Sequence, residues 1–317
     1  MSSQEFYDII LQKNLKVSLL KNSHFTLGTS PYYAHEHGLA LDIYHDLSLV
    51  NYDVLSPISG KVLKTKKLIA PKAKFKGGID NDYITLIRNS DESDVVFKIL
   101  HVKPKVQVGD QIEIGDYIGS TIRNGYFAYW SSPHLHLELR PPNDAVRARG
   151  GKDFSLAIQN HSEINQSVDI NSIKQIPIEI EAIFPEFLLA RFPKDFYYEI
   201  KPIFGVRGNI NSLNCILDGG IPHYKNGVII IHHDYNINFP NSVFFGDYKI
   251  GTLHKLRDEI GLVKFNPVRF YLNGKEIRGI SLFLANFNPL IKLIPYDKSE
   301  FFFNSEATQY LSIESIL

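Results

Sequence analysis

The sequence predicts a mainly β protein with two domains. Apolar and polar residues alternate over short runs, as in residues 178–181, and this period of two is typical of half-buried strands. Turn signals separate the runs, for example the pair Asn273-Gly274 between two apolar segments. The chain has 317 residues, of which 44% are hydrophobic, which is sufficient for two packed cores.

The elements follow one another in a clear order. Isolated apolar pairs near the N-terminus predict a short amphipathic helix. Dense strand and turn signals follow, until Pro141-Pro142 ends the last strand of the first domain, because proline cannot extend a ladder of hydrogen bonds. A polar connection precedes a second β-rich region of unrecognised type and unknown role. The predicted limits are 1–24 for the helical extension, 25–150 for the first domain, 151–175 for the connection and 176–317 for the second domain.

Charge and cysteine content narrow the range of partners. Lys plus Arg and Asp plus Glu number 34 each, so no broad attraction to nucleic acid or to an acidic membrane is indicated. The single cysteine, Cys215, excludes an intramolecular disulfide. Residues 1–20 contain no continuous apolar core of a signal peptide, and no run reaches the roughly 18 apolar residues of a transmembrane helix. The default expectation is a cytoplasmic chain without a transmembrane segment.

Residues 131–140 form the most informative segment of the chain. His134 and His136 stand two positions apart in a strand-like run, so both imidazoles project to the same side. One of them can hold a metal while the other stands beside it. The opposite face of the predicted strand is apolar and can pack against a core, because it carries Leu135, Leu137 and Leu139.

Two further segments carry histidines in strand-like apolar surroundings. Residues 35–43 contain His35, His37 and Asp42, and residues 99–102 contain His101. Imidazole nitrogen and carboxylate oxygen are ligands of zinc, and a catalytic zinc site uses three protein ligands and leaves a position for water. Together the three segments predict a metal site.

Over residues 25–150 the chain resembles the LytM/lysostaphin-type zinc metalloendopeptidases, whose fold contains a duplicated hybrid motif. Those enzymes carry a His and an Asp on one strand, a strand ending in Tyr-x-His-Leu and a final Gly-Pro-His-Leu-His-Phe-Glu strand. The counterparts here are the three histidine segments. Three further segments occur in the same order. Residues 54–62 resemble the family's Val-x-Ala-Pro-x-x-Gly-x-Val hairpin, and residues 82–87 resemble its following strand. Residues 106–119 resemble its Val-x-x-Gly-Asp-x-Val-x-x-Gly-x-x-Ile-Gly segment.

The resemblance implies a fold, a cofactor and a reaction. The first domain is expected to be a hybrid-motif β-sandwich that hydrolyses peptide bonds with a water activated by one Zn²⁺ ion. His37, Asp42 and His136 are implied as zinc ligands, and His101 and His134 as the catalytic histidines that do not bind metal. No other cofactor is implied.

The spacing before Asp42 departs from the family, in which the first His usually precedes its Asp by four positions. His37 precedes Asp42 by five positions and His35 by seven, so in a regular strand both would face away from Asp42. A bulge or turn at Gly38 can restore convergence, because glycine tolerates unusual backbone angles. His37 is the favoured ligand and His35 the alternative.

Two residues beside these motifs can take either a structural or a functional role. Glu138 can support a ligand histidine, but a surface carboxylate is the favoured interpretation, and it is left out of the site. Among nearby aromatic residues, Trp130 has the best case for contact with the site, because it is the only tryptophan and is close to His134.

Two other classes of function stay open. The first is a non-catalytic scaffold or activator that binds a partner protein or peptide, favoured only by the unusual spacing before Asp42. The second is a carrier-type hybrid-motif module, which ranks third because no modifiable lysine stands in a hairpin tip. The family acts outside the cytoplasmic membrane on cell-wall cross-bridges, which conflicts with the missing signal peptide and leaves the peptide substrate, the compartment and the oligomeric state open.

Overall fold

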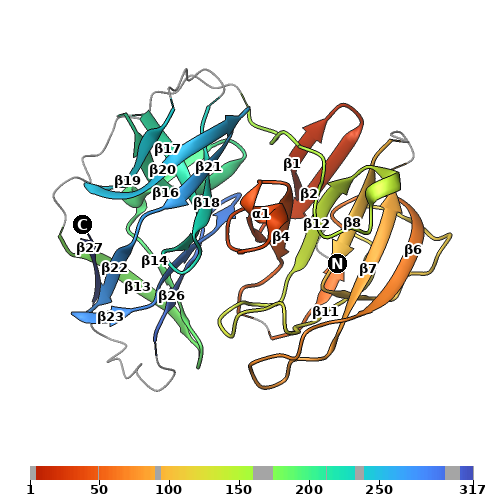
Figure 1. Ribbon diagram of the computed structural model, residues 1–317, viewed down its shortest axis with the longest axis horizontal. Coiled ribbons are helices and arrows are strands. Elements are labelled where there is room, and N and C mark those ends of the chain that lie inside the picture. The colour runs from red at the N-terminus through yellow and green to blue at the C-terminus, as the bar shows by residue number, and fades with distance from the viewer. Residues whose placement is uncertain are drawn as a thin grey trace. The chain divides into compact units, whose positions relative to one another are not determined.

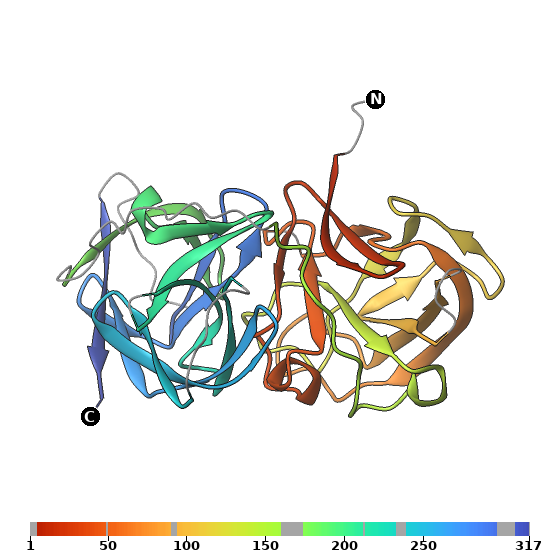
Figure 2. The same cartoon turned by 90° about the horizontal axis from the view of Figure 1, so that it is seen from above.

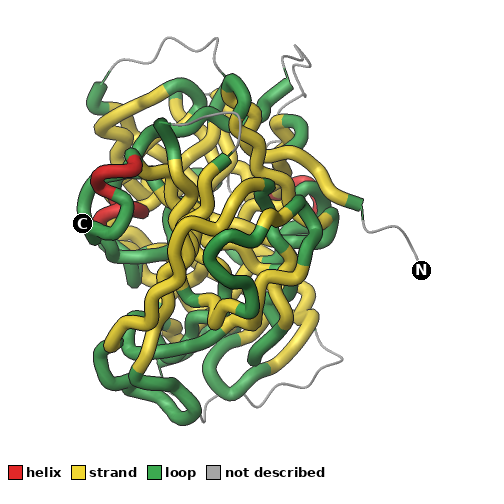
Figure 3. Tube along the Cα trace, turned by 90° about the vertical axis from the view of Figure 1, so that its right-hand side faces the viewer, coloured by secondary structure: helices red, strands yellow, loops and turns green. Residues whose placement is uncertain are grey.

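The computed structural model describes residues 5–48, 50–89, 94–159, 174–211, 213–232, 239–296 and 308–316. Within these ranges the chain is mainly β, with one four-residue α-helix, α1 (Tyr33–Glu36), and two 3-10 turns, η1 (Pro142–Asp144) and η2 (Lys194–Phe196) (Figures 1 and 3). The predicted fold class is therefore confirmed. No helix in the described part is long and apolar enough to cross a membrane.

The N-terminal residues form a hairpin, so the helix predicted over 1–24 is wrong. Strand β1 (Phe6–Gln12) pairs antiparallel with β2 (Leu15–Leu20). Lys13, at the turn between them, takes a positive φ of 52°. The apolar pairs that suggested a helix lie on strands, where Ile9, Val17 and Leu19 are buried. Their spacing is short enough to fit either period, and tertiary burial decides between them.

The chain divides into two compact units: residues 1–25 with 39–157, and residues 26–38 with 158–317. The sequence predicts residues 26–38 as part of the first domain, whereas the structure has them in the second unit. The segment packs in the second unit because the buried carboxylate of Asp218 accepts hydrogen bonds from Thr26 Oγ1 at 2.5 Å and from the Leu27 backbone N–H at 2.6 Å. Asp218 is too far away in sequence for local patterns to reveal this anchor. Residues 160–173 of the predicted connection lie outside the described ranges.

The first unit contains a six-stranded antiparallel sheet in which β12 lies between β4 and β8 (Figure 1). Its spatial order is β4 (Ala40–Tyr44), β12 (Leu135–Arg140), β8 (Val96–Leu100), β7 (Asn81–Arg88), β6 (Gly60–Ile69) and β10 (Gln111–Ile112). A second sheet holds β5 (Asp53–Leu55), β11 (Tyr117–Thr121) and β9 (Val102–Pro104). Strand β3 (His24–Thr26) precedes α1.

The second unit is built from antiparallel strands that curve around a common interior (Figure 2). Six of them pair in a ring that returns to its first member: β16 (Ile203–Ile210), β17 (Leu213–Ile221), β18 (Asn226–Ile230), β21 (Ile260–Phe265), β20 (Tyr248–Arg257) and β19 (Asn241–Phe245). The others are β13 (Ile176–Ile183), β14 (Leu188–Arg191), β15 (Tyr197–Ile200), β22 (Val268–Leu272), β23 (Lys275–Ile277), β24 (Gly279–Leu282), β25 (Leu284–Ala285), β26 (Ile291–Ile294) and β27 (Gln309–Ser315).

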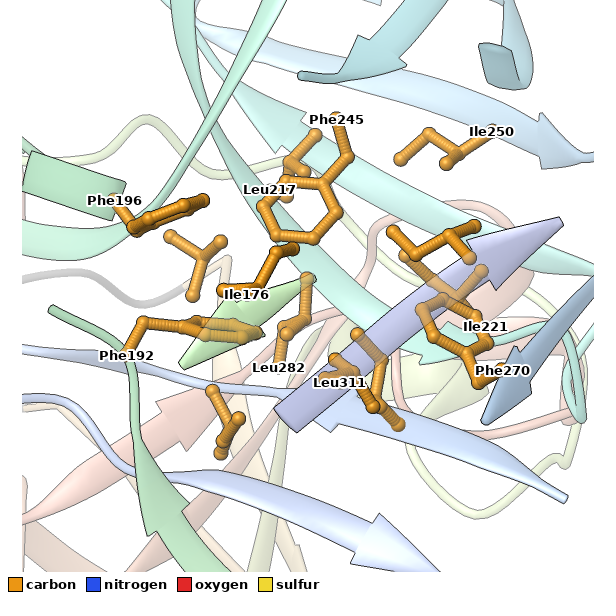
Figure 4. Packing of buried hydrophobic residues seen from close by; sticks show 14 of the residues in the cluster. Ile176, Phe192, Phe196, Leu217, Ile221, Phe245, Ile250, Phe270, Leu282 and Leu311 are labelled. Atoms are coloured by element: carbon orange, nitrogen blue, oxygen red, sulfur yellow. The ribbon is translucent and has the colours of Figure 1, made fainter. Parts of the chain in front are cut away.

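The interior of the second unit is a continuous apolar cluster. Phe192, Phe245 and Phe270 pack there against aliphatic side chains from many strands (Figure 4). Cys215 belongs to the same cluster and is fully buried. Burial raises the pKa of the Cys215 thiol, so it is an unreactive core residue.

We expect Phe270→Ala to destabilise the second unit by about 3–5 kcal/mol, because Phe270 is fully buried and its removal leaves a cavity. The matched control is Phe287→Ala, because Phe287 is 48% exposed, and its cost should stay below about 1 kcal/mol. The rate at which a thiol reagent labels Cys215 across a urea series reports unfolding of this unit. Equal midpoints for the two variants would contradict the assignment of the core.

Candidate metal centre

One face of β12 carries a row of buried polar side chains. His134 precedes the strand, and His136, Glu138 and Arg140 follow at intervals of two, so all four project to the same side. Each is less than one tenth exposed. Burying a row of polar groups is costly unless each finds partners, so the neighbouring strands must supply them.

Strand β4 brings a carboxylate directly opposite His136. Asp42 is its register partner, and Asp42 Oδ1 lies 2.8 Å from His136 Nδ1. The other ring nitrogen, Nε2, lies 3.1 Å from Glu138 Oε1. Burial alone would lower the pKa of His136, but hydrogen bonds to and charges of the two carboxylates raise it to about 9. Without a metal, His136 is therefore an imidazolium between two carboxylates.

Strand β8 supplies a cation opposite Glu138. Lys98 is the register partner of Glu138, with Nζ 2.9 Å from Oε1, and Arg140 NH1 donates to Oε2 at 3.0 Å. Burial would raise the pKa of Glu138, but His136 and Lys98 together lower it to about 2. The interpretation of Glu138 as a surface carboxylate is thus wrong, because these cations stabilise its charge in the interior.

Arg140 is itself held at the end of the polar row. It is fully buried, and its NH2 donates to the carbonyls of Asp144 at 2.7 Å and Arg149 at 2.8 Å. The same nitrogen lies 3.0 Å from the carboxylate oxygen Oδ2 of Asp144. Arg140 therefore fixes Glu138, which in turn fixes the ring of His136.

His101 directly follows β8, in a left-handed backbone conformation with φ of 66°. Asp82 on β7 accepts the His101 backbone N–H at 3.1 Å, and its Oδ2 lies 2.8 Å from His101 Nδ1. The Nδ1–Oδ2 distance is that of an ion pair, but the two groups are not aligned for a hydrogen bond. Burial would raise the pKa of Asp82, but its interactions with His101 lower it.

The sequence pattern does not single out Asp82 as a site residue, although it lies in residues 82–87, one of the segments that resemble the family. Its signal was a carboxylate at the start of an otherwise apolar strand, residues 82–87. Only the pairing of β7 with β8, in which Ile84 faces Leu100, brings Asp82 beside His101.

His134 lies against His101, with ring centroids 5.4 Å apart in an edge-to-face arrangement. Its Nδ1 lies 2.9 Å from the Ser132 carbonyl oxygen, which accepts its proton, and its Nε2 lies 3.4 Å from Asp42 Oδ2. Burial lowers the pKa of His134 to about 3 despite the charge of Asp42. In the neutral ring, Nε2 and Asp42 Oδ2 are both acceptors, so a bridging proton donor or cation would be favourable there.

His35, Asp42 and His136 each offer one ligand atom, and these atoms all lie within 4.8 Å of one another. His35 is buried, and its Nδ1 lies 2.7 Å from the carbonyl oxygen of Leu27, which leaves Nε2 as its ligand atom. The structure therefore groups the alternative histidine with Asp42 and His136, and the favoured ligand His37 is not part of this group.

His37 lies elsewhere for a local reason. Its ring stacks on Tyr33 at 4.0 Å, and its Nδ1 lies 2.9 Å from the Tyr33 carbonyl oxygen. Helix α1 replaces the regular strand before β4, so the alternation of faces does not apply, and Gly38 has a positive φ of 60°. The turn predicted at Gly38 is present, and it directs a different histidine from the one favoured.

The donor set fits a zinc ion. Two imidazoles and one carboxylate match a catalytic zinc site with a remaining position for water. In both histidines the second ring nitrogen is held by an oxygen acceptor, Leu27 O for His35 and Glu138 Oε1 for His136. Such partners fix the tautomer and orientation of metal-binding histidines.

Aromatic side chains lie beside the predicted catalytic histidines, among them Phe127, Tyr44 and, 6.4 Å from His101, Tyr126. The Phe127 ring centroid lies 4.8 Å from those of both His101 and His134, and Tyr44 lies 4.9 Å from His134. Trp130, the aromatic residue favoured from sequence, packs edge-on against Tyr129. Apolar rings around His134 account for the burial that keeps it neutral.

Comparisons with known proteins identify a family of two domains. Residues 14–156 match the "Domain of unknown function (DUF8155) N-terminal domain", and residues 203–307 match the corresponding C-terminal domain. Together these matches span more than half of the chain. A search of curated proteins found no match.

Two solved structures show a distant likeness. One is titled "NMR solution structure of lysostaphin", with 13% identity, and the other "The antimicrobial peptidase lysostaphin from Staphylococcus simulans", with 14% identity. Each match covers 78% of this chain and 95% of the other, with a TM-score of 0.25. At this TM-score the likeness supports no conclusion about this chain.

We expect the metal-free protein to lose stability as the pH rises from 6.5 to 9. The pKa of His136 is raised to about 9 in the folded state, above its ordinary value of 6.5. Its stabilising contribution is therefore complete below pH 6.5 and disappears as the pH passes through 9. Urea unfolding of chelator-treated protein, followed by the fluorescence of Trp130 in the first unit, measures this slope. His136→Asn should flatten it, and an unchanged slope would count against a charged His136.

Proposed function

The chain belongs to the DUF8155 family, and we propose that it is a zinc-dependent metalloendopeptidase that hydrolyses peptide bonds. One observation carries the proposal: a buried His35/Asp42/His136 group, with both histidines oriented by oxygen acceptors, adjoins a second pair of histidines. The order of these residues along the chain supports the same reading through the resemblance of residues 25–150 to LytM-type enzymes.

His35, Asp42 and His136 would hold the zinc ion. When bound, the ion supplies a Lewis acid that polarises a peptide carbonyl and lowers the pKa of water towards about 7. Asp42 also contributes the negative charge that a cation requires in a buried site. Glu138 keeps Nε2 of His136 protonated and so directs Nδ1 towards Asp42.

His134 is assigned to orienting the attacking water. Its pKa of about 3 makes it a weak base but a stable hydrogen-bond acceptor at neutral pH. The Ser132 carbonyl holds its Nδ1 proton, so Nε2 presents a lone pair beside Asp42. A water that donates to this nitrogen is held next to the metal ligands.

His101 is assigned to proton transfer. The carboxylate of Asp82 favours a proton on Nδ1 and stabilises the imidazolium that forms when Nε2 accepts a second proton. A carboxylate that orients and supports a catalytic imidazole in this way is known from the serine protease triad. His101 would take the proton of the water and return it to the leaving amine.

The scaffold hypothesis loses its one supporting argument. It depended on the unusual spacing before Asp42, and helix α1 with the turn at Gly38 leaves His35 near Asp42 and His136 despite that spacing. The peptide substrate stays a proposal at the level of the bond hydrolysed, with glycine-rich or D-amino-acid cross-bridges suggested by the family resemblance alone.

We expect the untagged wild-type protein to hold about one zinc ion per chain, measured by elemental analysis after equilibration with the metal. His35→Ala and Asp42→Asn should each lose most of it, because each removes a ligand. His37→Ala is a matched control two positions from His35 and should keep its zinc. Zinc-free wild type, or equal loss in the two histidine variants, would contradict this ligand set.

We expect His101→Ala and Asp82→Asn to retain zinc and to hydrolyse peptides at least about 100-fold more slowly, because proton transfer is impaired. The assay uses a pool of quenched octapeptides that includes Gly-Gly and D-alanyl bonds. Asp80→Asn is the matched control, because Asp80 is exposed and lies two positions before Asp82. Zinc-loaded wild type that cleaves none of the pool would overturn the peptidase and favour the scaffold.

A further inference from the structure

A pocket of about 880 Å³ opens on the second unit, within the size range of small-ligand and peptide sites. Its walls come from the start of β18, the connection from β21 to β22, the end of β23 and the residue Tyr296. None of the residues argued to hold zinc or to transfer protons lines it. The pocket thus shares no residue with the proposed peptidase site, although Glu36, which lines it, directly follows His35 in the chain.

Cations dominate the lining of this pocket. Lys225, Lys264, Arg269 and Arg278 line it, against two carboxylates, those of Glu36 and Glu276. Arg269 lies 3.9 Å from Glu276, which offsets part of that charge. Since the chain as a whole is neutral, a net positive pocket is a local feature that attracts anionic ligands.

Exposed apolar side chains stand among these cations. Tyr296 is 53% exposed and Ile316 is 43% exposed, and both line the pocket. The guanidinium of Arg278 lies 5.1 Å from the centre of the Tyr296 ring. Tyrosine and arginine are among the residue types enriched at the positions that contribute most binding energy in protein interfaces.

We propose that this pocket binds an acidic peptide segment, with carboxylates on its cations and an aromatic or aliphatic side chain against Tyr296 and Ile316. Phosphate and other compact anions would use the charges and leave the apolar side chains without a role. An acidic peptide uses both, which is the reason for this choice of ligand. The proposal does not depend on the peptidase activity.

The test is fluorescence anisotropy of the full-length protein with labelled octapeptides. One pool contains glutamate at four positions and phenylalanine or leucine at the others, and the matched pool contains glutamine in place of glutamate. The glutamate pool should bind at least about tenfold more tightly, with the difference reduced at high salt. Inorganic phosphate is added separately as a competitor.

Variants locate the binding. Lys264→Glu and Tyr296→Ala should weaken binding at least about fivefold, whereas Lys255→Glu, an equal charge change at an exposed position outside the pocket, should stay within about twofold. Equal affinity for the two pools, or equal weakening by Lys255→Glu and Lys264→Glu, would overturn the proposal. No binding of the glutamate pool would likewise overturn it, and binding that phosphate displaces but Tyr296→Ala does not weaken would overturn it in favour of a simple anion site.

Discussion

The candidate site depends on one constraint, the row of buried polar side chains on β12. The polar side chains from His134 to Arg140 are buried, so they must satisfy one another or find partners on β4 and β8. The register does this by placing Asp42 opposite His136 and Lys98 opposite Glu138. A shift of one residue would turn every one of these side chains to the leucine side.

The two predicted catalytic histidines differ because their surroundings differ. His134 lies among aromatic rings, and the carbonyl oxygen of Ser132 accepts a hydrogen bond from its Nδ1. Burial keeps the His134 ring neutral. His101 has a carboxylate, Asp82, at ion-pair distance from its ring. The His134 ring is thus suited to accept a hydrogen bond, whereas the His101 ring stands beside a carboxylate, a difference that the sequence motif alone left open.

Local periodicity predicted the parts of the fold that depend on local rules. The alternation of His and Leu in residues 134–139 identified the strand, its two faces and the polar side that carries the site. The turn at Gly38 was also predictable, because a special backbone angle was required there. Periodicity failed for residues 6–20, where short apolar pairs fit a helix and a strand equally well.

The parts that escaped prediction are those fixed by distant residues. The alternation of side chains between the two faces of a strand could not decide between His35 and His37, because the chain forms α1 there and not a strand. Glu138 looked like a surface residue because its partner Lys98 is 40 positions away. Asp82 gained its role only through the pairing of β7 with β8. Ion pairs and strand registers between residues far apart in the sequence cannot be inferred from the residues next to them.

The same charges explain why the site should favour a cation. Around His136 the carboxylates of Asp42, Glu138 and Asp144 are matched by Lys98, Arg140 and the imidazolium itself. When His136 loses its extra proton, Asp42 loses the charge that balances it in a buried position. A metal cation held by the proposed ligands His35, Asp42 and His136 would restore that balance, so a proton and a metal would compete for His136. Metal affinity at such a site must therefore rise with pH until the proton is gone.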